Sequence, residues 1–197
     1  MEKKKIKILA LFGKSASGKD TIQNWIVSSF PQLTHKIVSC TTRPKRENEK
    51  EGFDYFFLTD EEFTKKVLDG SMLEATSFRD WFYGTALDQL DSEKINVGVF
   101  NPSGVEYLLE DSRLEVVPVL IYANGKIRLL RSLSRENSPN CGEVCRRYLA
   151  DEKDFEEVEF EYYGWINEID EHSTWRYRIE QLSRILTSCS WADFNDL

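Results

Sequence analysis

Residues 6–19 read Ile-Lys-Ile-Leu-Ala-Leu-Phe-Gly-Lys-Ser-Ala-Ser-Gly-Lys, and they give the strongest indication of the fold class. Ile6–Phe12 is β-branched and apolar, which predicts a buried strand that ends at Gly13. Gly13–Lys19 fits the pattern G-x-x-x-x-G-K, whose glycines let backbone N–H groups turn toward a phosphate. Apolar residues recur at helical spacing over 21–29, so the loop joins a strand to a helix.

The loop and the first helical turn supply the contacts that we expect for ATP and Mg²⁺. Lys19 would reach the β- and γ-phosphates, and the positive end of the helix adds to their attraction. The position after the lysine, where Ser or Thr usually binds Mg²⁺, holds Asp20, and Thr21 follows. Either residue is a candidate metal ligand. The expected ATP-binding residues here are Gly13, Lys14, Ser15, Ala16, Ser17, Gly18, Lys19, Asp20 and Thr21.

Along the rest of the chain, segments of strand character alternate with segments of helical periodicity. We expect strands at 36–39, 55–58, 95–100, 116–122 and 165–167, and helices at 60–68, 103–111, 126–133, 143–161 and 174–186. Thr59 or Asp60 is the expected cap of the first of these helices, and Ser103 that of the second. A polar loop is expected at 134–142. This alternation implies an α/β fold with a parallel sheet flanked by helices.

The composition restricts the classes of function. The chain has 197 residues, 41% of them apolar, which suits one domain with a hydrophobic core. No apolar run reaches the roughly 18 residues of a membrane helix, and the net charge of −8 disfavours non-specific binding to nucleic acid. Four cysteines without zinc-type spacing are typical of reduced thiols in a cytoplasmic protein. We therefore expect a cytoplasmic protein without a nucleic-acid or membrane partner.

A basic loop follows the segment at 36–39. Arg43 and Arg46 lie three residues apart, and both can contact one phosphate, for which the arginine fork is better suited than lysine. Taken alone, this pair is more typical of a solvated surface loop. Ser39 and Tyr55 accompany it in the sequence and add hydroxyl groups, which favours a phosphate site.

The order and spacing of these motifs are similar to those of the guanylate kinase family. The resemblance is densest over 6–87 and weaker over 95–187, and it rests on the phosphate loop, Ser39–Arg46, Gly52–Phe57, Glu74 and Phe82–Thr85. It implies a P-loop kinase fold with an inserted acceptor-binding lobe and a lid. It further implies one domain over 1–197, with its core at 1–35, 91–133 and 148–190, the acceptor lobe at 36–90 and the lid at 134–147.

The resemblance also implies roles for single residues. The acceptor phosphate would be held by Ser39, Arg43, Arg46, Tyr55 and Tyr83. Glu74 and Thr85 would recognise guanine, because a carboxylate accepts hydrogen bonds from both N1–H and the 2-amino group. The catalytic cations would be Lys19, Arg131, Arg135 and Arg147, and Asn167 would lie near the adenine. Arg146 is equally well explained by ion pairs with the acidic segment 151–161.

The chain departs from the family pattern after the strand at 95–100. The family usually carries Asp-x-Asp there, and this chain has Val99 and Asn101. Asn101 keeps a hydrogen-bond acceptor for the substrate but has no charge. The ribose 1,5-bisphosphate phosphokinases resemble this chain in having Asp after the loop lysine, but they tend to lack the Gly-x-Asp-Tyr stretch that is intact at 52–55. That acceptor is therefore the alternative to a nucleotide.

The residues together predict phosphoryl transfer from Mg·ATP to a nucleoside monophosphate, with GMP or dGMP as the first choice. The acceptor oxygen is already anionic, so the reaction needs positioning and charge stabilisation rather than a general base. A guanylate-kinase-like module that binds a protein without catalysis is the rival from another class. Such modules typically lose the phosphate loop, whereas this chain retains its glycines and lysine. We expect a monomer or a homodimer.

Overall fold

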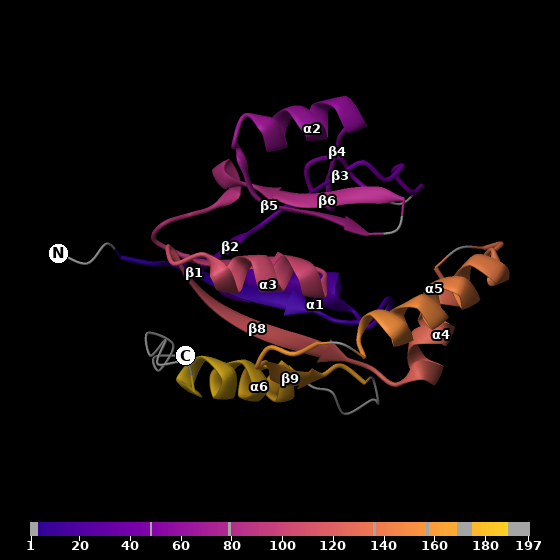
Figure 1. The fold of residues 1–197 in the computed structure, drawn as a ribbon. Helices are drawn as coiled ribbons and strands as arrows, with labels where there is room; N and C mark the ends of the chain where they lie inside the picture. The colour runs from indigo at the N-terminus through magenta and orange to yellow at the C-terminus, as the bar shows by residue number, and fades with distance from the viewer. Residues whose placement is uncertain are drawn as a thin grey trace. The chain divides into compact units, whose positions relative to one another are not determined.

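The computed structural model describes residues 4–47, 49–78, 80–135, 137–156, 158–168 and 175–188. Helices and strands alternate along the chain in an α/β fold, as the sequence predicts (Figure 1). The chain forms two compact units. The first unit comprises Met1–Phe12 with Lys19–Pro118, and the second comprises Gly13–Gly18 with Val119–Leu197. Each unit is described by itself below.

A sheet of parallel strands forms the centre of the first unit. The strands that pair there are β2 (Thr34–Lys36), β7 (Ile95–Val99) and β1 (Ile6–Phe12), and β8 (Leu114–Tyr122) and β9 (Tyr163–Ile166) complete the strand order β2-β7-β1-β8-β9. Five successive residues, from Ile8 to Phe12, are almost fully buried, which explains why this strand is apolar on both faces. α1 (Lys19–Ser29) and α3 (Pro102–Glu110) are amphipathic helices of the same unit.

A second sheet of the first unit has the strand order β4-β3-β6-β5. Its strands are β3 (Cys40–Thr41), β4 (Phe56–Phe57), β5 (Met72–Phe78) and β6 (Trp81–Ala86). β5 and β6 form an antiparallel hairpin that the sequence analysis does not predict. α2 (Asp60–Leu68) lies beside this sheet (Figure 1), where Phe63 packs on Cys40 and Ala86.

Two buried carboxamides lie where the chain passes between the two sheets. Nε2 of Gln23 donates to the carbonyl oxygens of Ile37 and Val97, at 2.9 and 2.8 Å, just beyond the end of β2. On the return path, Asn96 accepts from the backbone N–H of Asp91 at 2.8 Å and donates to the carbonyl oxygen of the same residue. The side chains of Gln23 and Asn96 therefore form hydrogen bonds with backbone groups near the points where β2 ends and β7 begins.

In the first unit, several helices and strands begin or end at other residues than the sequence analysis predicts. The strand expected at 36–39 is instead divided, because the chain leaves one sheet after Lys36 and enters the other at Cys40. The expected cap Thr59 is confirmed, and it forms a capping box with Glu62. The expected cap Ser103 is wrong, since the side chain of Asn101 accepts from the N–H of Gly104 and Pro102 begins the helix.

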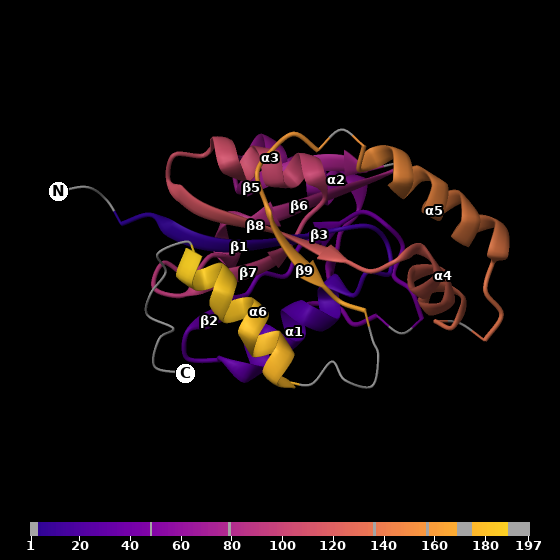
Figure 2. The same cartoon turned by 90° about the horizontal axis from the view of Figure 1, so that it is seen from below.

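The second unit contains the end of β8, then α4 (Gly125–Leu133), α5 (Cys141–Asp154), β9 and α6 (Trp175–Ser188). Figures 1 and 2 both show α4 and α5 side by side. The helix expected at 143–161 ends at Asp154, where Phe155 is its C-cap. β9 pairs in parallel with β8, and Trp165 is almost completely buried. In the part of the chain that the structure describes, no helix has the length and apolar character needed to cross a bilayer.

Candidate active site

The phosphate loop of the second unit has a backbone that only small residues can adopt. Gly13 has φ +149°, Ala16 has φ +61° and Gly18 has φ +95°. A Cβ atom on Gly13 would collide with the carbonyl oxygen of Ile121, and one on Gly18 would collide with the amide of Asn167. The two glycines of the motif are therefore required by close approach as well as by backbone conformation.

Arg131 and Asn167 hold the carbonyl groups of this loop. Nη1 of Arg131 donates to the carbonyl oxygens of Ala16 and Ser17, at 3.3 and 3.0 Å, and Nη2 donates to that of Asn167 at 2.8 Å. Nδ2 of Asn167 also donates to the carbonyl oxygen of Ser17, at 2.7 Å. Burial lowers the pKa of Arg131. Both residues, expected as contacts to the reacting phosphates and to adenine, here bind the loop backbone.

Two acidic residues of α5 contact the same loop, which the sequence analysis does not predict. The backbone N–H of Ser15 donates to Oδ2 of Asp151 at 2.6 Å, and Lys14 forms an ion pair with Glu152. Arg128 of α4 is 4% exposed and contacts both carboxylates. The signal in the sequence was the acidic run itself, which is equally typical of a solvated helix face.

The remaining expected cations of the second unit lie on α4 and α5 or just beyond them. Arg135 is exposed, and no ion pair involves it within the described ranges. Arg147 and Arg146 both contact Glu143, one turn earlier on α5, at 3.1 and 2.7 Å. These are the contacts of a helix surface, and for Arg146 they include an ion pair with Glu143 that the sequence analysis does not predict.

Lys19, Asp20 and Thr21 belong to the first unit, where they form the first turn of α1. Lys19 is half-buried, and Asp20 and Thr21 are exposed. A carboxylate in the first turn is favourable because the helix N-terminus carries partial positive charge.

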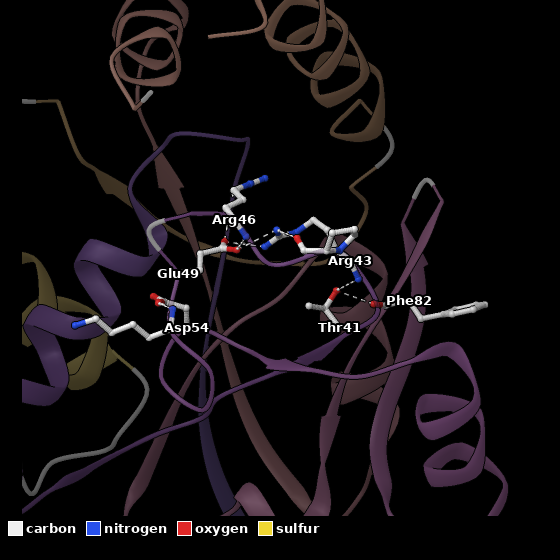
Figure 3. Close-up of polar contacts among 8 residues, drawn as sticks. Thr41, Arg43, Arg46, Glu49, Asp54 and Phe82 are labelled. Carbon is white, nitrogen blue, oxygen red and sulfur yellow. Dashed lines mark hydrogen bonds and ion pairs between the residues drawn. The ribbon is translucent and has the colours of Figure 1, made fainter. Parts of the chain in front are cut away.

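The loop that follows β3 in the first unit holds Arg43 in one orientation (Figure 3). Arg43 is 7% exposed and forms a bidentate pair with Glu49, at 2.7 and 3.0 Å. The backbone N–H of Arg46 donates to the same carboxylate at 2.8 Å. Burial lowers the pKa of Arg43, but the hydrogen bond with Glu49 and the charge of that carboxylate together contribute to raising it above its usual value. Glu49 is a site residue that the sequence analysis misses, although its place three residues after Arg46 was the available signal.

Aromatic rings surround the buried guanidinium. The Arg43 group lies 5.5 Å from the ring centroid of Tyr55 and 5.8 Å from that of Phe57. The rings of Tyr55 and Tyr83 are 6.2 Å apart in an edge arrangement. Burial raises the pKa of Tyr55, so its hydroxyl remains a neutral donor near neutral pH. The structure therefore brings three of the five expected phosphate contacts together.

Arg46 and Ser39 complete that expected set. Arg46 is partly exposed, and its guanidinium lies 3.7 Å from Glu49. Ser39 is half-buried, and its carbonyl oxygen accepts from the N–H of Phe56 at 2.9 Å, which places its backbone beside β4, directly before β3.

Glu74 and Thr85 face each other across the hairpin of β5 and β6. Glu74 is 5% exposed, and burial raises the pKa of its carboxyl group to about 7. The Thr85 hydroxyl is fully buried, and hydrogen bonds from the side chain and the backbone of Thr85 to the Glu74 carboxylate lower its pKa by less than burial raises it. A buried carboxylate with a strongly raised pKa is a feature of a site for a polar ligand.

Asn101, expected as an acceptor contact, has a local structural role. Oδ1 accepts from the N–H of Gly104 at 2.7 Å, and Nδ2 donates to the Thr76 hydroxyl at 2.8 Å. The same Gly104 lies close to Glu74, because its Cβ position would be 3.5 Å from Oε2. Asn101 thus connects the start of α3 to the strand that carries Glu74.

Comparisons with known proteins agree with this arrangement. Residues 5–176 match the guanylate kinase family. A guanylate kinase of Wolbachia pipientis wMel is 30% identical over 184 residues, which cover 91% of this chain and 88% of that protein. A guanylate kinase of Campylobacter jejuni strain RM1221 is 29% identical over 160 residues, covering 79% of this chain and 78% of that protein.

Solved structures share the fold. The crystal structure of guanylate kinase from Anaplasma phagocytophilum superposes with a TM-score of 0.67 at 24% identity, covering 94% of this chain and 87% of that one. A gluconokinase from Sinorhizobium meliloti 1021 superposes with a TM-score of 0.53 at 12% identity, covering 97% of this chain and 99% of that one.

Proposed function

The chain belongs to the guanylate kinase family, and from this premise we propose that it phosphorylates GMP or dGMP with ATP. The observation that carries the choice of acceptor is the buried pair Glu74 and Thr85. The guanine edge presents two donors, N1–H and the 2-amino group, to a carboxylate. Adenine presents an acceptor at N1 and would give the buried carboxylate no hydrogen bond from the base, which is costly.

The acceptor phosphate would bind at Arg43 and Arg46, with hydroxyl donors from Ser39, Tyr55 and Tyr83. Glu49 supports this proposal because it fixes the Arg43 guanidinium in one orientation before the substrate arrives. A fixed fork loses less side-chain entropy when it binds a phosphate.

ATP would bind at the phosphate loop and Lys19, with its γ-phosphate toward the loop N–H groups. Asp20 and Thr21 are exposed oxygen donors directly after this lysine, and Mg²⁺ is commonly held by one or two protein oxygens together with phosphates and water. These two residues therefore fit the metal and would hold it. Bound Mg²⁺ neutralises charge on the β- and γ-phosphate oxygens.

In the proposed reaction, a phosphate oxygen of GMP attacks the γ-phosphorus of ATP. The bond from that phosphorus to the bridging oxygen of ADP breaks, and GDP and ADP are the products. Lys19 and the arginines Arg131, Arg135 and Arg147 would stabilise the charge on the transferring group. Asn167 would contact the adenine side of the bound ATP, and Asn101 would contact the acceptor through its remaining hydrogen-bonding capacity.

The division into a core, an acceptor lobe at 36–90 and a lid at 134–147 is part of this proposal. So are a cytoplasmic location, a monomeric or homodimeric state and the absence of a nucleic-acid partner, which the net charge of −8 supports.

Release of ADP from Mg·ATP tests the proposal when the acceptors GMP, dGMP, AMP, UMP, dTMP and ribose 1,5-bisphosphate are compared. Turnover confined to GMP or dGMP is the expected result. Lys19→Ala should abolish it, and Lys65→Ala, which removes an exposed lysine of α2, should leave it unchanged. Turnover on ribose 1,5-bisphosphate alone would move the substrate to that alternative. ATP binding without turnover on any acceptor would favour the protein-binding module.

A further inference from the structure

A carboxylate of the chain itself occupies donors of the phosphate loop. The backbone N–H of Ser15 donates to Oδ2 of Asp151 at 2.6 Å, and the Ser15 hydroxyl donates to Oδ1 at 3.2 Å. Backbone N–H groups of such loops bind phosphate oxygens. One carboxylate thus accepts from both donors of a residue that a nucleotide would otherwise use.

Cations around this carboxylate complete an environment suited to a larger anion. Arg128 is 4% exposed, and its Nη1 lies 3.8 Å from Oδ2 of Asp151. That nitrogen is fully buried and makes no hydrogen bond of ordinary geometry within the described part of the chain. Lys14 and Nη2 of Arg128 share Glu152, the next residue of the helix. A buried guanidinium nitrogen that is close to an anion but not fully satisfied indicates that the carboxylate fits this place incompletely.

The position of Asp151 on α5 also indicates that its carboxylate fits this place incompletely. The residue lies in the last turn of a helix that ends at Asp154, and acidic residues are disfavoured at a helix C-terminus. Its contacts with the loop offset that cost. A di- or triphosphate carries more charge and more acceptor oxygens than one carboxylate, so it is the stronger ligand for the same donors.

We propose that Asp151 is an internal competitor for nucleotide phosphate, which occupies the donors of Ser15 in the nucleotide-free protein and is displaced when ATP binds. This inference rests on the proposed function only in that the loop binds a nucleotide. The exchange replaces one anion by another at the same donors, so the loop keeps its conformation between turnovers. The affinity for ATP is lower than the loop alone would give, because each binding event first breaks the contacts of Asp151.

Nucleotide affinity tests the proposal without any need for turnover. The dissociation constants of ATP, ADP and inorganic pyrophosphate are measured by titration calorimetry, with no acceptor present, for the wild type, Asp151→Ala and Asp151→Asn. We expect Asp151→Ala to bind all three about tenfold more tightly, which is about 1.4 kcal/mol. Asp151→Asn should gain less, because its amide oxygen still accepts from Ser15. Asp154→Ala and Asp154→Asn are matched controls, exposed on the same helix, and should bind as the wild type does.

The outcomes separate this inference from the proposed function. Equal or weaker binding by both Asp151 variants, with thermal unfolding temperatures near that of the wild type, would overturn the inference while leaving the kinase assignment intact. Asp151→Asn keeps the size of the side chain, so it reports even where the alanine variant folds poorly. A wild type that binds none of the three probes would overturn both.

Discussion

Glu74→Gln is the most direct test of how the acceptor base is chosen. The substitution keeps the shape of a side chain that is 5% exposed and removes its charge. A carboxylate can accept from both guanine donors, whereas a carboxamide offers one acceptor and turns its NH₂ group toward a donor. We therefore expect the variant to bind GMP weakly and to distinguish purine bases poorly.

The magnitude follows from the difference between charged and neutral hydrogen bonds. Hydrogen bonds to a charged group contribute about 1.5–3 kcal/mol and neutral ones about 0.5–1.5 kcal/mol, so two bonds lose about 2–3 kcal/mol. The KM for GMP should rise roughly 30- to 150-fold. The kcat should change little, because in the proposed function Glu74 contacts the base and not the transferring phosphoryl group.

The pH dependence adds an independent signature. Burial raises the pKa of Glu74 to about 7, so the ionised form increases from pH 6 to pH 8. The KM of the wild type for GMP should therefore fall by about tenfold over this range and level off above pH 8. The phosphate of GMP also titrates, with a pKa of about 6. The titration of GMP affects the wild type and Glu74→Gln alike. The ratio of their KM values for GMP at each pH therefore reports the ionisation of Glu74 alone.

Stability should change with pH in the opposite sense. The folded protein keeps a proton on Glu74 that the unfolded chain releases as the pH rises from 4.5 to about 7. The free energy of unfolding falls through this window, by at most about 3 kcal/mol, and the loss persists at higher pH. Glu74→Gln has no such loss, so its stability relative to the wild type should increase between pH 5 and pH 8 in urea titrations.

Two results would refute this reasoning. The first is a ratio of KM values for GMP that stays constant from pH 6 to pH 8. The second is a Glu74→Gln variant that retains both the affinity and the preference for GMP over AMP. Either would mean that the carboxylate is buried for a structural reason and that another group recognises guanine.

Three further substitutions test other parts of the site. Gly13→Ala should weaken ATP binding at least tenfold in calorimetry, because its methyl group collides with a backbone carbonyl oxygen; unchanged affinity would contradict the loop geometry. Arg43→Lys loses the bidentate contact with Glu49, so the KM for GMP should rise about tenfold while ATP affinity stays constant, as measured by ADP release and calorimetry. Asn101→Ala removes a helix cap that is worth about 1 kcal/mol, so the thermal unfolding temperature should fall by roughly 2–4 °C; a drop in kcat without that shift would instead indicate a contact with substrate.

The phosphate loop and its flanking elements could be predicted because their signals are local. An apolar strand, two glycines and an amphipathic helix follow one another, and close contacts enforce the glycines. The cap of α2 was predictable for the same reason, since a threonine followed by a glutamate three residues later forms a capping box. Pro102 after Asn101 was a similar signal for the start of α3.

The hairpin of β5 and β6 could not be predicted so easily, because one of its buried cross-strand pairs is polar. Glu74 and Thr85 are buried together without belonging to the apolar core, and they interrupt the alternation that marks a strand. No glycine or proline marks the end of α5, so the sequence there holds no local signal for it. The contact between Ser15 and Asp151 joins residues far apart in the sequence, and no local pattern encodes it.

The two buried carboxamides at the crossings between the sheets of the first unit have a mechanical consequence. Gln23 fixes the outgoing chain at Ile37, and Asn96 fixes the returning chain at Asp91. Asn101, whose Nδ2 donates to the Thr76 hydroxyl of β5 at 2.8 Å, holds the four-stranded sheet at a third point. Loss of any one of these three carboxamides should therefore loosen the attachment of this sheet while the pairing of its own strands persists.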